Sequence, residues 1–148
     1  MATSILVPIA PSQTASGSAA LALAADFAKT RDGKITVLSV IEDAGPLFWV
    51  APREIVERNR AAAMKAVRDV VAAQDMVDDD DIVFLDGHPA RAILDYARDM
   101  KIDMIVMASH DPVLADYVLG SVAAHVVAHA RCSVLVVRNR LAQPNHSG

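Results

Sequence analysis

The chain has 148 residues, enough for one domain, and because 53% are hydrophobic but only 4% aromatic, its core must be built mainly from aliphatic side chains. The formal net charge of −4, without a basic patch, argues against nucleic-acid binding. One cysteine excludes an internal disulfide, and no apolar run approaches the roughly 20 residues that a membrane span needs. With no basic leader before the first apolar run, we expect a cytoplasmic protein without membrane insertion.

The amino-terminal region predicts a strand followed by a helix. Ser4–Ile9 is apolar and forms the expected first strand. A loop rich in Pro, Ser and Thr follows, in which Ser16 or Ser18 can cap a helix that runs to about Thr30. We expect Gly33 to end this helix as a left-handed cap.

The next segment predicts a second strand, a loop and a long helix. Lys34–Ile41 is the strand, and Glu42–Ala51 is expected to be an irregular loop. The apolar Leu47–Trp49 in this loop could pack on its own domain, contact another subunit or form a lid beside a cleft. A helix follows from Pro52, a favourable first-turn residue. Its expected buried stripe is Val56, Ala63, Val67 and Val70.

The third unit begins at an acidic turn. Asp78–Asp81 lacks the alternation and the distal glutamate of an EF-hand loop, so we expect a solvated turn. Ile82–Leu85 is the third strand and Ala90–Met100 the next helix. Between them, we expect Gly87 to permit a close approach of the backbone near the strand ends.

The carboxy-terminal region predicts strand, loop, helix and strand. Met104–Met107 and Val134–Val137 are short, β-branched and unalternating, as expected of strands buried on both faces. Gly120-Ser121 opens a helix that runs to about Ala130. Free amides and the positive end of the helix dipole would meet at Gly120-Ser121, which suits a phosphate, although Gly and Ser are also ordinary helix caps.

Five strands alternating with four helices predict a single-domain α/β fold with an open, doubly wound parallel sheet. Two other patterns point to weaker alternatives. His125 and His129 have metal-ligand spacing on one helix, but no third ligand is apparent, so we expect exposed or dimer-facing histidines and no metal site. Ser121 with His110 lacks the G-x-S-x-G nucleophile elbow, and no P-loop motif is present, so we expect no catalytic residues.

Several stretches together resemble the universal stress protein family. They are spread over nearly the whole length of the chain: Ile5–Ile9, Val106–Asp111, Leu119–Val122 and Cys132–Arg138. Pro112 and Tyr117 in the intervening loop resemble the enterobacterial F/G-like branch. The resemblance implies an adenine nucleotide alpha hydrolase-like sheet in the order 3-2-1-4-5, with a universal stress protein domain over residues 1–140. Residues 141–148 are polar and without periodicity, so we expect a flexible tail there.

The resemblance also implies a cytoplasmic stress-response regulator that binds AMP, ADP or ATP, with or without Mg²⁺, where strands 1 and 4 lie side by side. Such a protein acts by binding rather than turnover, although similar proteins leave room for slow autophosphorylation or ATP hydrolysis. The implied nucleotide-binding residues are Pro8, Ala10, Val40, Met107, Ser109, His110, Gly120, Ser121 and Val122.

Three residues depart from the pattern of the nucleotide-binding members. Ala108 and Asp111 replace glycines, and Ala10 replaces the usual acid after the first strand. These departures support an alternative, a nucleotide-free dimeric protein-interaction module of the same fold. A small hydrolase or transferase is disfavoured because a base and a metal constellation are missing. The resemblance further implies a homodimer through Val134–Val137 and a regulatory protein partner that the sequence leaves unidentified.

Overall fold

The structure, a computed structural model, describes residues 2–42, 49–109 and 119–138. Its five parallel strands lie in the order β3-β2-β1-β4-β5, as predicted. The strands are β1 (Ser4–Pro8), β2 (Lys34–Ile41), β3 (Ile82–Asp86), β4 (Met104–Ala108) and β5 (Ser133–Val137). The four helices that lie wholly within the described residues are α1 (Thr14–Arg31), α3 (Arg53–Ala72), α4 (Pro89–Asp99) and α5 (Ser121–His129).

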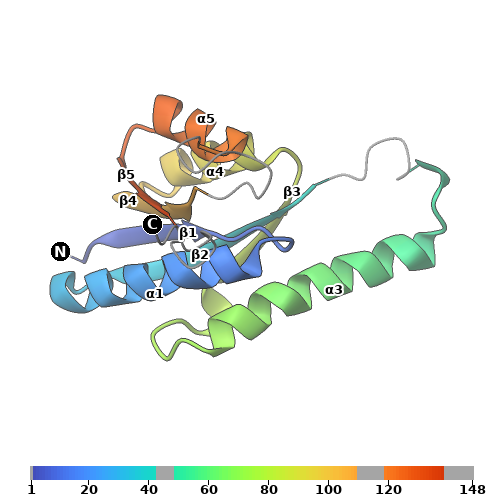
Figure 1. The fold of residues 1–148 in the computed structure, drawn as a ribbon, viewed down its shortest axis with the longest axis horizontal. Coiled ribbons are helices and arrows are strands. Elements are labelled where there is room, and N and C mark those ends of the chain that lie inside the picture. Colours follow the sequence, from blue (N-terminus) through green and yellow to red (C-terminus); the bar gives the residue numbers. More distant parts are fainter. Residues whose placement is uncertain (1, 43–48, 110–118, 139–148) are drawn as a thin grey trace, which may run out of the picture.

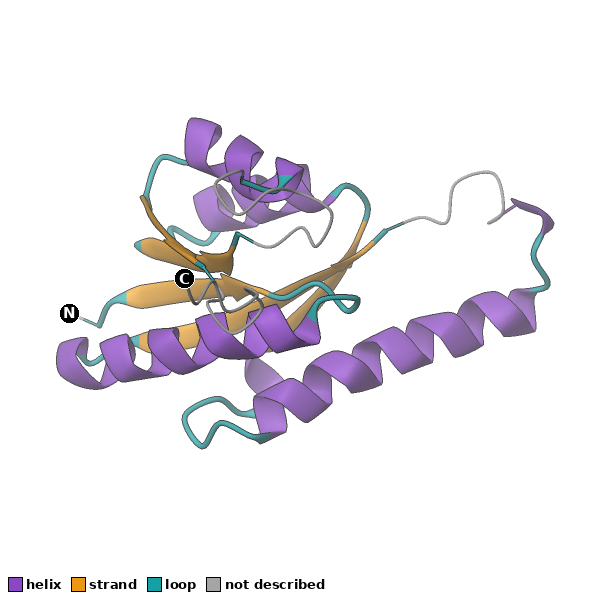
Figure 2. Ribbon diagram, viewed as in Figure 1, coloured by secondary structure: helices purple, strands orange, loops and turns teal. Residues whose placement is uncertain are grey.

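Helices cover both faces of the sheet, with α1 and α3 on one side and α4 and α5 on the other (Figure 1; Figure 2). Strand residues alternate between the two layers. Ile5 and Val7 pack into the α1/α3 layer, whereas Leu6 and Leu38 pack into the α4/α5 layer. Both faces of β1 and of β4 are therefore buried, which explains why these strands read as continuous apolar runs.

Helix α1 differs from the prediction at both ends. It begins at Thr14 after Gln13, whose side chain makes no capping hydrogen bond, so Ser16 is not the cap but a buried residue inside the helix. At the other end Asp32, with φ of 49°, takes the left-handed position that was predicted for Gly33. Gly33 is needed for space instead, because an added Cβ would lie 3.0 Å from the Cα of Ala28.

Helix α3 is buried over its carboxy-terminal half alone. Val67 and Val71 are fully buried, whereas Val56, Ala63 and Val70 of the predicted stripe are half-buried. Figure 1 shows the reason, since the first turns of α3 extend beyond the sheet. Leu47 and Phe48 lie outside the described residues. Trp49 is helical, so for this residue the prediction of an irregular loop is wrong, and its exposed fraction of 84% speaks against packing on its own domain, the first of the three possibilities.

The acidic turn is solvated, as predicted. Asp79–Asp81 form a 3-10 turn that is capped by Asp78, and Asp79 pairs with Arg68 of α3 at 3.4 Å. Gly87 was expected to permit a close approach of the backbone, and this reason for the glycine is wrong. No atom lies within 4 Å of a Cβ added there, but its φ of +125° is one that a side chain would strain.

Strand β5 is an edge strand, and this changes its burial. The sequence predicted two buried faces, but Leu135 is 37% exposed and Val134, Val136 and Val137 are half-buried. One neighbour, β4, is hydrogen-bonded to β5 on one side, and no described strand lies on the other. Complete burial within one copy of the chain therefore does not account for the apolar run of β5.

Candidate functional site

A cavity of ≈ 390 Å³ opens at the carboxyl ends of β1, β2 and β4. Its wall also contains the beginnings of α1, α4 and α5 and one residue of α3, Ala63. This is the crevice of an open α/β sheet, where connections from two neighbouring strands leave in opposite directions. Its volume suits a ligand of drug or nucleotide size.

Pro8 explains why β1 and β4 stop pairing at this end of the sheet. The amide of Ile9 donates to the carbonyl of Leu38 on β2, so the alternate residues Leu6 and Pro8 direct their backbone groups toward β4. Pairing of β1 with β4 ends at Leu6 and Ile105, because the next residue that faces β4 is a proline without an N–H. The ladder stops there, and the two strand ends flank the cavity.

Most of the residues that were predicted to bind a nucleotide line this cavity. Ser109 does not line it, and His110 lies outside the described residues, as do Asp111, Pro112 and Tyr117. The predicted residues that do line the wall are Pro8, Ala10, Val40, Met107, Gly120, Ser121 and Val122.

Ser109 has a role that the prediction did not foresee. It is buried, its amide donates to the carbonyl of Val137 at 3.0 Å, and its own carbonyl accepts from the amide of Gly120 at 3.1 Å. The Gly120 amide is therefore already used within the protein. The first bond inside α5 runs from the Ala124 amide to the Gly120 carbonyl at 2.9 Å, which leaves the amides of residues 121–123 without acceptors in the helix.

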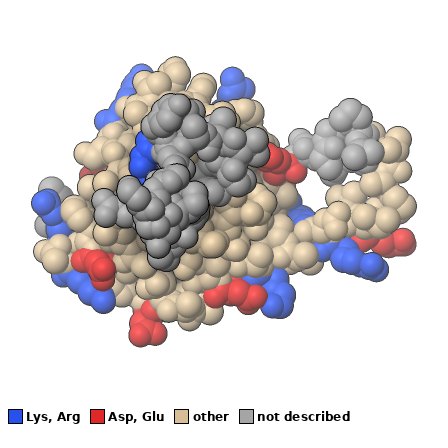
Figure 3. Space-filling model, in the orientation of Figure 1, with Lys and Arg blue, Asp and Glu red and all other residues tan. Residues whose placement is uncertain are grey.

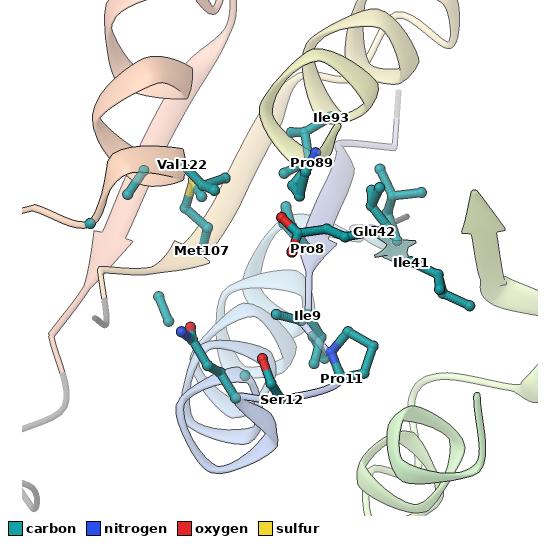
Figure 4. Close-up of a pocket in the computed structure, with 18 of the residues that line it drawn as sticks. Pro8, Ile9, Pro11, Ser12, Ile41, Glu42, Pro89, Ile93, Met107 and Val122 are labelled. Atoms are coloured by element: carbon teal, nitrogen blue, oxygen red, sulfur yellow. The ribbon is translucent and has the colours of Figure 1, made fainter. Parts of the chain in front are cut away.

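Sequence reasoning missed other residues of the wall. Ser12 and Gln13 precede α1, Pro89 begins α4, and Glu42 follows the last residue of β2. In Figure 4 the Glu42 carboxylate is directed toward the middle of the cavity. The available signal was position, because Glu42 follows a strand directly and the carboxyl ends of parallel strands meet at one edge.

Other candidate groups lie elsewhere. His125 and His129 are exposed and stacked, with ring centroids 4.4 Å apart, and the described residues contain no group of three or more His, Cys, Asp or Glu arranged to hold a metal ion. Cys132 is half-buried, and this burial, assisted by the charge of Asp103, raises the pKa of its thiol. A raised pKa lowers the thiolate fraction and thus the reactivity.

The surface and the helices add two observations. On the face drawn in Figure 3, acidic and basic side chains are interspersed among uncharged residues. Within the described ranges, no helix combines the length and the apolar character that crossing a membrane requires.

Comparison with known proteins agrees with this architecture. A universal stress protein of Methanocaldococcus jannaschii is 30% identical over 123 residues, which are 78% of this chain and 71% of the relative. The solved structure of universal stress protein UspA from Lactobacillus plantarum is 28% identical, with a TM-score of 0.74, over 92% of this chain and 97% of that one. A universal stress protein solved in complex with cAMP is 21% identical, with a TM-score of 0.64, and shares the fold over 93% of this chain and 97% of its own. The model of the universal stress protein family matches residues 1–138, and the chain therefore belongs to the universal stress protein family.

Proposed function

We propose that this protein is a stress-response regulator of the cytoplasm that binds an adenine nucleotide in the cavity between β1 and β4 and acts by binding rather than by turnover. The observation that carries the proposal is the position of the α5 amino terminus in the wall of a cavity that is otherwise largely apolar. Apolar side chains such as Val40, Met107 and Val122 suit a purine ring, and the helix end suits a phosphate. A family member of the same fold was solved with cAMP.

The residues at the helix end fit a phosphate in two respects. The three amides of residues 121–123 have no acceptor within α5, and Gly120, at the entry to the helix, adds no side chain to the wall. Gly120 has φ of −59° and ψ of 156°, which any residue can adopt, so a glycine is not required by the backbone conformation. Its value here lies in the space that it leaves for a ligand.

A magnesium ion would need ligands from the nucleotide itself. Glu42 is the acidic residue that the described part of the wall contains. One carboxylate together with phosphate oxygens and water is a common environment for Mg²⁺. In the proposed site, protein groups thus bind the nucleotide, and any Mg²⁺ takes ligands from the phosphates.

We further propose a homodimer through β5, because its outer edge is apolar and, in the described residues, uncovered. Since the Val137 carbonyl faces β4, the backbone groups of Val134 and Val136 face away from β4, toward the free edge. An exposed apolar edge favours pairing with another strand. A second copy of β5 related by a two-fold axis would offer the same pattern of donors and acceptors.

The test is mass spectrometry of ligand released from freshly purified protein, followed by calorimetry with AMP, ADP and ATP. Release of an adenine nucleotide, or saturable binding with a rise in melting temperature, is the expected result, because a ligand bound to the native state alone stabilises it. Absence of binding at millimolar nucleotide would contradict the proposal. It would favour the second candidate, a nucleotide-free dimeric interaction module, which the departures Ala10 and Ala108 support.

A further inference from the structure

The charge of the cavity wall is uneven. Glu42 is the one ionisable side chain that the described part of the wall contains, and this part includes no Lys, Arg or His. Arg60 lies one turn before the lining residue Ala63 on α3, but its guanidinium pairs with Asp86 of β3. Arg138 follows β5 and does not line the cavity.

Glu42 and α5 approach the cavity from different sides. The Glu42 carboxylate extends from the end of β2 toward the middle of the cavity, between Pro8 and Pro89 as seen in Figure 4, while Val122 marks the beginning of α5 at another part of the wall. The amino terminus of a helix supplies an effective charge of about +0.5. A ligand with two phosphates or more would therefore bring several negative charges to a wall that offers half a positive charge and one full negative charge.

Resting on the proposed function of this site, we infer that Glu42 selects the ligand by charge and by hydrogen-bond donors. The preferred ligand is an adenine nucleoside with no more than one phosphate. A single phosphate accepts hydrogen bonds from the amides at the start of α5. The Glu42 carboxylate, which can only accept, takes a hydrogen bond from a hydroxyl or amino group of the nucleoside. Each further phosphate adds repulsion from Glu42 that no cation of the described wall offsets.

The experiment compares the protein with Glu42→Gln, which keeps the shape of the side chain and removes its charge. Calorimetry measures the affinities of adenosine, AMP and ATP without Mg²⁺ at one fixed ionic strength. The unmodified protein should bind AMP more tightly than ATP. In Glu42→Gln the ratio of ATP affinity to AMP affinity should rise at least about fivefold, and adenosine should bind more weakly because the amide is a poorer acceptor.

Glu54→Gln is the matched control, since Glu54 is exposed in the first turn of α3 and does not line the cavity. It should leave the ATP-to-AMP ratio unchanged. Binding of adenine ligands with the same ratio in Glu42→Gln as in the unmodified protein would overturn the role of Glu42 and leave nucleotide binding intact. If none of the three ligands binds either protein, the proposed function fails and this inference fails with it.

Discussion

The carbonyl oxygen of Ser109 accepts a hydrogen bond from the amide of Gly120, with 3.1 Å between the two atoms. This bond ties the start of α5 to the end of β4, while the amide of Ser109 ties the same point to Val137 at the end of β5. The position of the helix terminus over the cavity is therefore determined by two strands of the sheet. A phosphate bound there would meet the amides of residues 121–123 rather than that of Gly120.

Adding a side chain at Gly120 should weaken nucleotide binding more than it weakens folding. Gly120→Ala is compatible with the backbone angles of this residue, but it places a methyl group in the wall. We expect a loss of AMP affinity of at least about tenfold, or about 1.4 kcal/mol, and a larger loss for Gly120→Val. Calorimetry measures the affinity, and thermal unfolding without ligand serves as the control for folding. Unchanged affinity in both variants would show that the ligand does not approach this residue.

Proline at Val136 should separate dimerisation from folding. The amide of Val136 faces the free edge of β5, so its removal leaves the ladder to β4 in place, whereas the amide of Leu135 faces β4. We expect Val136→Pro to sediment as a folded monomer and Leu135→Pro, the matched control, to be strongly destabilised. The unmodified protein should be a dimer at micromolar concentration. Dimers of unchanged affinity in Val136→Pro would contradict pairing through β5.

Gly17→Ala should destabilise the protein, although alanine is the better helix former. Gly17 lies inside α1, where alanine alone would contribute about 1 kcal/mol. The new Cβ, however, would lie 2.5 Å from Cγ2 of the buried Ile9, and such overpacking costs about 1–3 kcal/mol. After the gain is subtracted from the cost, we expect the free energy of unfolding, measured in denaturant, to fall by up to about 2 kcal/mol.

Ile9→Ala removes Cγ2, the atom that the new Cβ of Gly17→Ala would approach too closely. The two substitutions together should therefore cost less than the sum of their separate effects. If Gly17→Ala alone proved more stable than the unmodified protein, helix propensity rather than contact with Ile9 would determine the change in stability at this position.

Stability in acid should depend on Asp103, which joins the amino-terminal ends of β1 and β4. Its carboxylate accepts hydrogen bonds from the amide of Ser4 at 2.8 Å and from the Ser4 hydroxyl at 3.0 Å, and these hold the pKa of Asp103 below its ordinary value of 3.8. Because the folded state has the lower pKa, the stabilisation is complete above about pH 4 and is lost as the pH falls through the folded pKa.

Asp103→Asn should thus have a lower melting temperature than the unmodified protein at pH 6, and the difference should shrink toward pH 3. Asp75→Asn, which alters an exposed acid in the turn after α3, should show a smaller difference at every pH. A constant gap between Asp103→Asn and the unmodified protein from pH 6 to pH 3 would contradict a role for the charged form.

The sequence by itself determined the alternation of strands and helices, because apolar runs such as Met104–Met107 and helical stripes such as that of Val67 are local patterns with different periods. It also placed Pro8 at the strand end where pairing with β4 stops, since a missing N–H is a property of the residue itself. The order of the strands, and those cavity-lining residues that were foreseen, were predicted from the family resemblance rather than from periodicity.

Tertiary structure alone decided the rest. Leu135 is exposed because β5 is the last strand of the sheet, and the first turns of α3 are uncovered because they extend past the sheet. A local sequence pattern does not reveal that a packing neighbour is missing at either place. Glu42 likewise resembles any polar residue of a loop until the sheet brings the ends of β1, β2 and β4 together around one cavity. Burial and charge environment depend on which segments pack together, and that is a property of the folded chain.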